Sequence, residues 1–345
     1  MALPASTKYP ARVYFFAQKP EDLLTAGYDS VRIEKRKDCT APWVTQTKAS
    51  KLCELHLAAG VHNYNYLDPD ADRENEYRAV LQNSVTPGTP VDIPQPVTRA
   101  VDTSFEMIMS VKEFQEIYLW GQESAFVAED GKSQPEYTYV HNILFGIAKV
   151  ERKLGIKLLP TRVVESHDYY REMNARGEWP SFFLDEFPVI NIESLKLKMP
   201  GADPVEYPAS WLRWHKDDGQ LMIVPDGTSF SGVGGRSLSG HQMIPDAFEV
   251  TYFAGFKPNE FPYDLREAVG MEAAYGPLNV GGDLVGGAGL AGSSLSLDGL
   301  SQSITTTNSS TNAGFGARIL VYGKLLPALY KSLSTYYRGL KIRVA

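Results

Sequence analysis

An acid, a hydroxyl, a base and a second acid stand side by side at Glu165–Asp168, and these are the residue types of hydrolytic sites. Catalytic triads converge in space from separate elements, and neighbours on one helix or turn rarely reach one another in that geometry. Glu165 could also pair with Asp185 or Glu186 as the two carboxylates of a glycosidase, although the sequence does not fix their separation. We therefore predict no catalytic residue, and a cell-wall glycan hydrolase stays one alternative.

Two cysteines and two histidines in the amino-terminal region match the ligand types of a zinc site. They are Cys39, Cys53, His56 and His62. Cys53 and His56 fall on one predicted strand at an odd separation, so their side chains point to opposite faces and cannot share an ion. The pattern predicts no zinc site.

Three aspartates at alternate positions, Asp68, Asp70 and Asp72, have the spacing of a calcium-binding loop. That loop needs glycine at its sixth position and a bidentate glutamate at its twelfth, and Arg73 and Ala79 stand there instead. We predict a polar turn before a strand, with weak calcium binding by the three aspartates left open.

The stretch Gly281–Ser310 is rich in small residues and contains a G-x-G-x-x-G pattern at Gly287–Gly292. Such a pattern binds a dinucleotide only where a strand precedes it and a helix follows it. Here the preceding residues have the pattern of helix and loop, and the following ones are serine-rich. We predict a loop of small residues, and no cofactor.

The composition narrows the class of protein. The chain has 345 residues, of which 43% are hydrophobic, with 34 basic and 41 acidic residues and a net charge of −7. An acidic surface repels DNA phosphates, which disfavours a DNA-coating or sequence-reading role. The sequence shows no run of about 18 or more apolar residues that could span a membrane and no signal peptide at its start. Two cysteines make no disulfide framework, so we expect a soluble protein from a reducing compartment.

Short aromatic and β-branched segments with a period of two run from Tyr9 to Ser84 and predict an antiparallel β-sandwich over residues 1–84. Their order, with Trp43 in the middle, resembles an immunoglobulin-like or fibronectin type III module. Four prolines follow within residues 85–98, which predict a stiff linker.

Helical spacing dominates the predicted core at residues 99–280. Apolar residues predict amphipathic helices at Val111–Leu119, which should end at Gly121, and at Val140–Leu154, with Gly155 as a stop signal and Gly146 at a close helix contact. A meander of hairpins is inserted at about 182–253.

The carboxy-terminal part consists of a predicted flexible extension at 281–316 and an amphipathic helix at 317–345. We expect the extension to become ordered only in an assembly, because glycine and serine offer little apolar area against their ordering entropy. The helix should contact a partner, although it could instead complete its own bundle. The interface candidates, which include two tryptophans that we regard as anchors rather than a sugar platform, are Trp211, Trp214, Ile319, Tyr322, Leu326, Leu329, Leu333, Tyr336, Tyr337 and Arg338.

These predictions combine into an α+β multidomain protein. An Ig/FnIII-like β-sandwich precedes a helical-bundle core with an inserted β-meander and a C-terminal helix.

The stretch Phe114–Tyr170 resembles the helical core of head–tail connector (adaptor) proteins of tailed bacteriophages. Those proteins have a helix, an acidic turn and a second helix of the form I-x-x-A-x-x-x-E-x-x-L-x-I. The matching positions of the second helix are Phe145, Ala148, Glu151 or Arg152, Leu154 and Ile156.

The strand-rich segment Phe187–Pro225 is similar to related virion proteins, so the resemblance covers about Thr103–Pro225. The chain departs from the small adaptors by its amino-terminal sandwich, its long β insertion and its glycine- and serine-rich tract. These departures leave its tier within the neck undefined.

The resemblance implies a virion structural protein that is made in the host bacterial cytoplasm and is not an enzyme. It implies a homo-oligomeric ring of about twelve subunits in the neck, in contact with the portal protein and other neck and tail proteins. DNA would pass through the ring without sequence recognition, and no membrane is involved. A collar, baseplate or decoration protein is the alternative within the virion.

Overall fold

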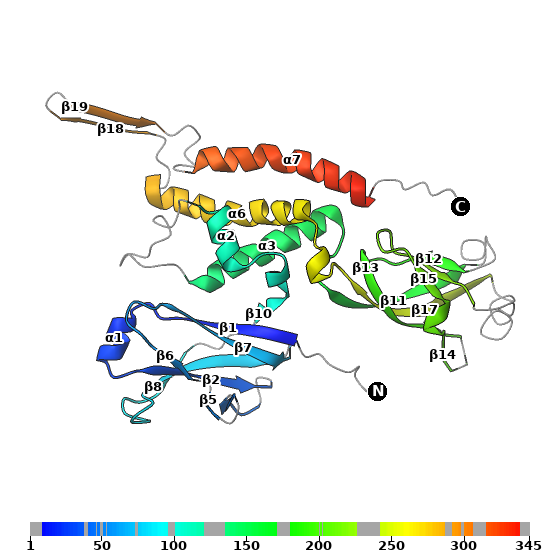
Figure 1. The fold of residues 1–345 in the computed structure, drawn as a ribbon, viewed down its shortest axis with the longest axis horizontal. Coiled ribbons are helices and arrows are strands. Elements are labelled where there is room, and N and C mark those ends of the chain that lie inside the picture. Colours follow the sequence, from blue (N-terminus) through cyan, green and yellow to red (C-terminus); the bar gives the residue numbers. More distant parts are fainter. Residues whose placement is uncertain are drawn as a thin grey trace. The chain divides into compact units, whose positions relative to one another are not determined.

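The computed structural model describes residues 9–37, 41–45, 47–48, 51–52, 54–72, 75–95, 101–120, 135–170, 180–199, 201, 203–225, 242–286, 292–297, 300–305 and 315–338 (Figure 1). The chain divides into two compact units. The first contains Met1–Leu144 and Ala274–Ile319, and the second contains Phe145–Ala273 and Leu320–Ala345. Helices and antiparallel sheets occur together, which agrees with the predicted α+β class.

Two sheets form the amino-terminal part of the first unit. One has the order β10-β1-β7, made of Val101–Asp102, Tyr9–Phe16 and Asn63–Ala71. The other has five strands, in which β6 pairs with β2 outside the order β3-β2-β8-β9. Its strands are Ser30–Arg36 (β2), Val44–Thr45 (β3), Glu54–His56 (β6), Glu76–Gln82 (β8) and Ile93–Pro94 (β9). A small hairpin of β4 (Thr47–Lys48) and β5 (Lys51–Leu52) follows β3 along the chain.

Side-chain alternation explains why these sheets share a core. Val31 and Ile33 of β2 are fully buried, whereas Arg32 between them points to the other face of the sheet. Val13 of β1 and Tyr77 of β8 belong to the same buried cluster, so the two sheets pack face to face. The predicted strands are observed, and the immunoglobulin-like or fibronectin type III type stays a prediction.

The sandwich continues beyond Ser84, where the sequence predicts a linker. Ile93 and Pro94 pair with β8, and the amide of Gln95 donates to the carbonyl of Ala79 over 2.8 Å. Proline fits here because β9 is an edge strand, where one missing amide donor is tolerated. The proline-rich segment therefore supplies a strand to the sheet.

The helices of the first unit begin with α1 (Pro20–Thr25) and α2 (Val111–Ile117). The hydroxyl of Ser110 caps α2 by accepting from the amide of Glu113 over 3.1 Å. A 3₁₀ turn at Thr103–Met107 precedes it, and Phe105 and Phe114 are fully buried. The predicted helix at Val111 is confirmed, although it ends at Ile117 and not at Gly121.

The second unit contains two further sheets around one core. A four-stranded sheet has the order β11-β17-β13-β14, and a three-stranded sheet has the order β12-β16-β15. Their strands are β11 (Thr161–Tyr170), β12 (Ser181–Phe183), β13 (Val189–Leu197), β14 (Val205–Glu206), β15 (Leu212–Trp214), β16 (Gln220–Ile223) and β17 (Met243–Ala254). Phe182 and Phe248 stack with ring centroids 5.1 Å apart inside this core. The strands predicted at about 182–253 are thus observed, but they do not form a meander, because β17 lies between β11 and β13 and β16 lies between β12 and β15.

Strand β11 corrects the prediction for the residues before the predicted meander. The sequence suggested a helix or turn around Glu165–Asp168, but Thr161–Tyr170 pairs along most of its length with β17. Exposed and half-buried residues alternate along it, which is the period of a strand with one covered face.

Three long helices contribute residues to both units: α3 (Glu136–Leu154), α6 (Tyr263–Gly286) and α7 (Gly316–Arg338). The predicted end of α3 is confirmed, because Gly155 follows it with φ +62°, where glycine is favoured. The predicted close contact at Gly146 is also confirmed. A Cβ built there would lie 2.8 Å from the carbonyl oxygen of Val269 in α6.

The structure differs from the predicted flexible extension at 281–316. Helix α6 continues to Gly286, and β18 (Gly292–Leu297) pairs with β19 (Leu300–Thr305) in a hairpin. Most of the glycine motif lies outside the described residues. The elements around it are a helix before and a strand after, the reverse of a dinucleotide-binding turn.

Candidate functional site

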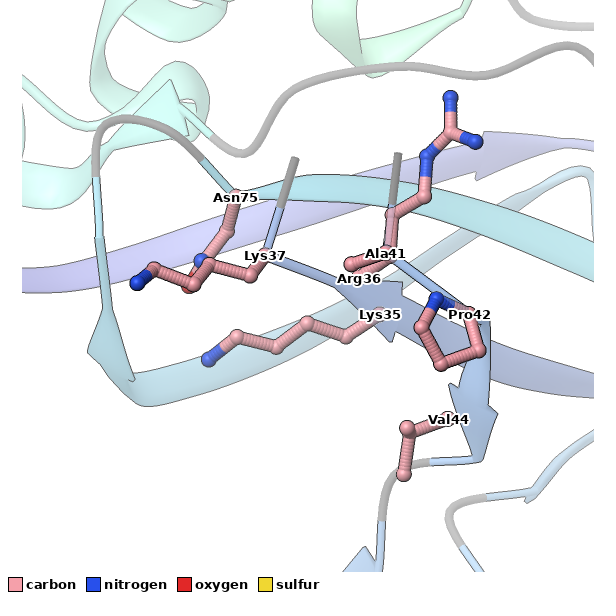
Figure 2. Close-up of a pocket in the computed structure, with 7 residues that line it drawn as sticks. All are labelled: Lys35, Arg36, Lys37, Ala41, Pro42, Val44 and Asn75. Atoms are coloured by element: carbon pink, nitrogen blue, oxygen red, sulfur yellow. The ribbon is translucent and has the colours of Figure 1, made fainter. Parts of the chain in front are cut away.

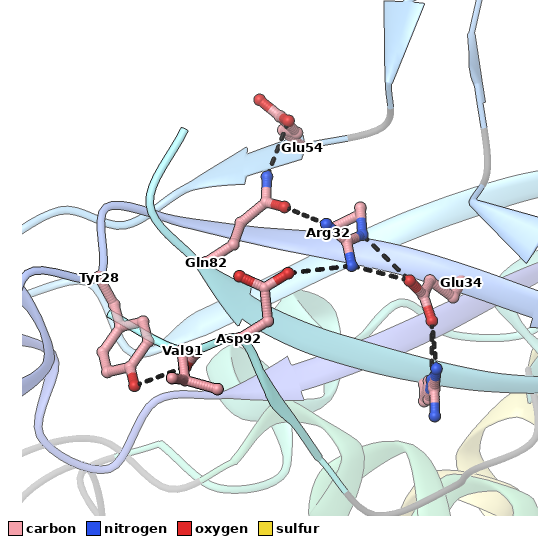
Figure 3. A network of polar contacts seen from close by, with 8 residues as sticks. Tyr28, Arg32, Glu34, Glu54, Gln82, Val91 and Asp92 are labelled. Atoms are coloured by element: carbon pink, nitrogen blue, oxygen red, sulfur yellow. Dashed lines mark hydrogen bonds and ion pairs between the residues drawn. The ribbon is translucent and has the colours of Figure 1, made fainter. Parts of the chain in front are cut away.

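A layer of charged side chains covers the outer face of the five-stranded sheet (Figure 3). Glu34 of β2 lies at its centre, and its side chain is only 8% exposed. Its two carboxylate oxygens accept from the guanidinium of Arg32 over 3.0 Å and from that of Arg78 over 2.8 Å. The charge of this buried carboxylate is neutralised by two cations of the same sheet. The cluster therefore has a structural role and is not a ligand site.

Further bonds tie the neighbouring strands into the same layer (Figure 3). Gln82 of β8 accepts from Arg32 over 2.6 Å and donates to Glu54 of β6 over 2.8 Å. Asp92, just before β9, pairs with Arg32 over 3.3 Å. The predicted linker is therefore fixed by charge as well as by strand pairing.

A hollow of about 380 Å³ lies at the end of β2 (Figure 2). Its lining residues are Lys35, Arg36, Lys37, Ala41, Pro42, Val44 and Asn75. Lys35 pairs with Asp68 over 2.7 Å, and Arg36 pairs with Glu76 over 2.5 Å. The charges of Lys35 and Arg36 are thus neutralised within the fold. The hollow therefore offers an anion little net positive charge.

Trp43 contacts two cations of the sheet. The guanidiniums of Arg36 and Arg78 each stand 4.4 Å from its ring centroid. Such cation–π contacts favour guanidinium over an aromatic face, so the tryptophan is anchored on its own sheet.

Asp68 and Asp70 of the calcium-like pattern lie on β7, whereas Asp72 lies in the predicted turn before β8, where its carbonyl accepts from the amide of Asn75 over 3.0 Å. Asp68 accepts from Lys35 and from the Tyr77 hydroxyl over 2.7 Å each, and from the amide of Asp70 over 3.0 Å. Burial acts to raise the pKa of Asp68, but these three donors outweigh it and hold the pKa below its ordinary value. The carboxylate therefore serves the fold.

The other metal-ligand types do not come together in the described ranges, where no group of three or more His, Cys, Asp or Glu is arranged around a common point. Cys39 and Cys53 lie outside the described residues. His62 is buried with its Nδ1 2.8 Å from the carbonyl oxygen of Ala17, and His56 is exposed on β6.

Glu165 and His167, predicted not to reach one another, are in contact in the second unit. Both lie on β11 two residues apart, so they share a face, and His167 Nε2 is 2.7 Å from Glu165 Oε1. The Tyr252 hydroxyl donates to the other carboxylate oxygen over 2.9 Å, and the amide of Asp185 donates to the first over 3.1 Å. The strand geometry brings together an acid and a base.

The remaining members of the reactive set are used elsewhere. Asp168 accepts from the amide of Asp246 over 2.8 Å, and Glu186 pairs with Lys157 over 3.4 Å. Burial acts to raise the pKa of Glu165, yet the hydrogen bonds from His167, Asp185 and Tyr252 hold it below its ordinary value. An ionised, fully hydrogen-bonded carboxylate is a poor general acid, so this cluster ties strands β11 and β17 together.

An adjoining hollow of about 450 Å³ is lined by Ser166, His167, Asp168, Tyr170, Ser181, Phe182 and Phe183. The imidazole of His167 lies against Phe182, with ring centroids 4.8 Å apart. One wall is thus aromatic and one polar. This hollow and the one at the end of β2 are the candidate small-molecule sites among the residues that the structure describes.

Helix α7 has one face buried within its own unit. Leu326, Tyr330, Leu333 and Tyr337 recur at helical spacing and are all buried. The Tyr330 hydroxyl donates to Glu272 of α6 over 2.9 Å, and Glu272, only 3% exposed, pairs with Lys149 of α3 over 2.5 Å. The buried carboxylate of Glu272 therefore links α3, α6 and α7.

A second face of α7 is exposed and apolar. Val321, Leu325 and Tyr336 lie on it at helical spacing, and Leu325 and Tyr336 are 49% and 60% exposed. Lys324 and Lys331 flank these residues, and α7 contains no Asp or Glu. We call Val321, Leu325, Tyr336, Lys324 and Lys331 the outer α7 face.

A complementary surface follows α2 in the first unit. Ile117 and Trp120 are exposed, Trp120 by 67%, and Glu113 and Glu116 lie on α2 before them, with Glu113 one helical turn before Ile117. We call Glu113, Glu116, Ile117 and Trp120 the α2 tip. Exposed tryptophan is uncommon and is favoured where a partner covers it.

The interface candidates predicted from the sequence divide into three groups. Leu326, Leu333 and Tyr337 are buried in the chain itself, whereas Ile319, Tyr322 and Leu329 are half-buried. Trp211 and Trp214 pack against the core of the second unit. Tyr336 is exposed, and the side chain of Arg338 lies outside the described part.

Sequence reasoning missed two of the features above. The Glu165–His167 contact depends on a strand that was not recognised. Val321 and Leu325 of the outer α7 face were missed, although Tyr336 was among the interface candidates, because the stripe chosen for α7 followed residues that the chain largely buries itself. The spacing of Val321, Leu325 and Tyr336, with lysines beside them, was the available signal.

No protein family model matches this chain, and no curated protein sequence matches it. A chain from the neck of an empty gene transfer agent (GTA) particle, computed with C6 symmetry, is similar at 17% identity and a TM-score of 0.32. A chain from the virion of a native GTA particle is similar at 19% identity and a TM-score of 0.33. Each match covers 48% of this chain and 76% of the other. Similarity of this degree leaves function to be argued from the residues.

Among the helices in the described ranges, none is both long and apolar enough to cross a bilayer.

Proposed function

We propose that this chain is a structural subunit of a tailed-phage-like virion and acts in the neck as a head–tail connector. The resemblance of Phe114–Tyr170 to connector proteins suggests this role, and the chemistry of the described residues supports it. Asp68 and Glu165, two of the carboxylates with lowered pKa values, are held by hydrogen bonds within their own units.

The observation that carries the proposal is the exposure of large apolar side chains on α3, on α7 and just after α2. Trp120, Phe145, Leu325 and Tyr336 all expose about half of their surface or more. Scattered exposed apolar residues are normal in monomers, but aromatic side chains beside charges of one sign are typical of surfaces that a partner buries. A subunit of an assembly has such surfaces.

In this proposal the sandwich of residues 1–84, extended by β9 and β10, is an Ig/FnIII-like module. The segment 99–280 is the connector core, and the hairpin within 281–316 and the C-terminal helix contribute to assembly. Subunits form a ring that contacts the portal and other neck or tail proteins in the virion. DNA passes through without sequence recognition, because a chain with net charge −7 offers it little attraction.

The test has two arms. Light scattering and negative-stain microscopy of the purified protein should find closed rings of one copy number. Antibody labelling of virions that carry the protein should mark the head–tail junction.

A label at the baseplate or on the capsid would favour the alternative virion roles. A protein that stays monomeric at all concentrations and labels no virion would contradict the proposal. Release of soluble sugar from purified cell wall would favour the hydrolase alternative.

A further inference from the structure

We propose that the outer α7 face of one subunit binds the α2 tip of a second copy of this chain. This inference rests on the proposed function, because it names the contact between subunits that would close the proposed ring. The two surfaces themselves are defined by the exposure and charge of their residues.

The outer α7 face has the anatomy of half an interface. Its apolar residues recur along several turns, and the small side chains of Ala328 and Ser332 lie between them. Small residues let another element approach the helix closely, and Tyr336 provides a large anchor at one end. The opposite face of α7 is already buried against α6 through Tyr330 and Glu272. The outer face is therefore the one that remains for another molecule.

The α2 tip has the matching chemistry. It presents two large apolar side chains, Ile117 and Trp120, beside the carboxylates of Glu113 and Glu116. Glu116 also pairs with Lys112 one turn earlier, over 3.7 Å. That pair is exposed, so it holds Glu116 only weakly and leaves its charge available to a stronger neighbour.

Charge identifies the second copy as the occupant. The outer α7 face is flanked by lysines alone, while the chain as a whole has 41 acidic and 34 basic residues. The lysines of the outer α7 face and the carboxylates of the α2 tip have opposite charges, so the two surfaces suit each other better than either suits itself, although Lys112 and Arg318 also lie close to the tip. Contacts between two different surfaces are heterologous, and they close into rings when the rotation permits.

A charge-swap experiment tests the pairing. Lys324→Glu should weaken association by about tenfold or more, measured by light scattering across a concentration series. Glu116→Lys should do the same. Both substitutions in one chain should restore association to within about threefold of the unaltered protein. An equimolar mixture of the two single variants should also assemble, because each supplies the partner that the other needs.

Matched controls separate this pairing from general effects. Lys112→Ala removes the same intrahelical ion pair as Glu116→Lys but leaves the carboxylate, so it should change association little. Glu206→Lys, an equal charge change on exposed β14, should also have little effect. Trp120→Ala should weaken association by about tenfold to a hundredfold if Trp120 is the anchor. Melting curves of all variants should match, which shows that they fold.

The outcomes are distinguishable. If the unaltered protein forms rings and the swapped pairs do not rescue each other, the pairing is wrong and the proposed function stands. If single variants assemble as well as the unaltered protein, the pairing is also wrong. If the unaltered protein neither associates nor labels virions, both proposals fail.

Discussion

At the scale of single residues, buried carboxylates act as cross-links within the fold. Glu34, Asp68, Glu165 and Glu272 each accept two or more hydrogen bonds or ion pairs from different elements. Buried charges of this kind are costly when a partner is lost, because the remaining charge stays desolvated. Substitutions at these residues should therefore affect stability first.

Glu272→Gln should lower the free energy of unfolding by about 1–3 kcal/mol, because it leaves Lys149 without its carboxylate. The lower end of the range for buried pairs applies, since the Lys149 side chain is 46% exposed. Urea unfolding at neutral pH measures this. Tyr330→Phe, which removes only one hydrogen bond, should lower it by about 0.5–1.5 kcal/mol. Equal losses for the two variants would argue against the ion pair.

Acid should destabilise the protein through Asp68 and Glu165. Their pKa values are lowered in the folded state, so they bind protons more readily when unfolded. The stability they provide is present above the unfolded pKa of about 4 and is lost as pH falls through the folded pKa. Asp68→Asn should lower the free energy of unfolding at pH 7, and the difference from the unaltered protein should shrink as the pH falls towards 3. Unfolding curves at several pH values test this, and parallel curves for both proteins would refute it.

At the scale of elements, the sequence was informative where one period dominated. The end of α3 at Gly155 and the strands β2 and β8 follow from apolar spacing and stop signals. It failed for β11, where polar residues on both faces weaken the alternation, and for the length of α6, whose glycines lower helix propensity. Tertiary packing overrides propensity at both places. The Glu165–His167 cluster could not be foreseen because it depends on β11.

Gly146→Ala should destabilise the contact between α3 and α6, although alanine favours helices. The added methyl would lie 2.8 Å from the Val269 carbonyl and 3.0 Å from Ala273. We expect a loss of about 1–3 kcal/mol by chemical unfolding. Gly323→Ala, on an exposed side of α7, should stabilise the protein by about 0.5–1 kcal/mol. Stabilisation by both substitutions would show that the helices can separate without penalty.

The strands beyond Ser84 should matter to the sandwich. A fragment of residues 1–107 includes β9 and β10, whereas a fragment of residues 1–84 leaves the edges of β8 and β1 uncovered. The longer fragment should show a cooperative melt at a higher temperature by circular dichroism. Identical melting temperatures for the two fragments would show that the module ends at Ser84, as the sequence predicts.

At the scale of the whole molecule, two properties matter: the net charge, and the division of each compact unit between separate segments of the chain. The net charge of −7 separates this chain from proteins that hold nucleic acid by neutralising phosphates. Composition predicted this property, and it needs no knowledge of the fold. The pairing of distant segments into two units was beyond sequence reasoning, because it depends on contacts between residues more than a hundred positions apart.

Duplex DNA should not bind to the protein with measurable affinity at about 150 mM salt. Electrophoretic mobility of a fluorescent duplex, with the protein at micromolar concentration, measures this. A shift that disappears with added salt would reveal a basic surface that the net charge conceals. A shift that depends on DNA sequence would contradict passive passage.

The division of each unit between two separate chain segments has a consequence for synthesis. Residues 274–319 complete the first unit and residues 320–345 complete the second, so each segment is synthesised well after the earlier part of its unit. At about 5–20 residues per second, the amino-terminal strands wait roughly 10–40 seconds for the helices that complete their unit. Neither unit is complete before these segments are made, and the outer α7 face lies in the later of the two. A nascent subunit therefore lacks this face while its strands are synthesised, which delays premature association between neighbouring nascent chains on one messenger RNA.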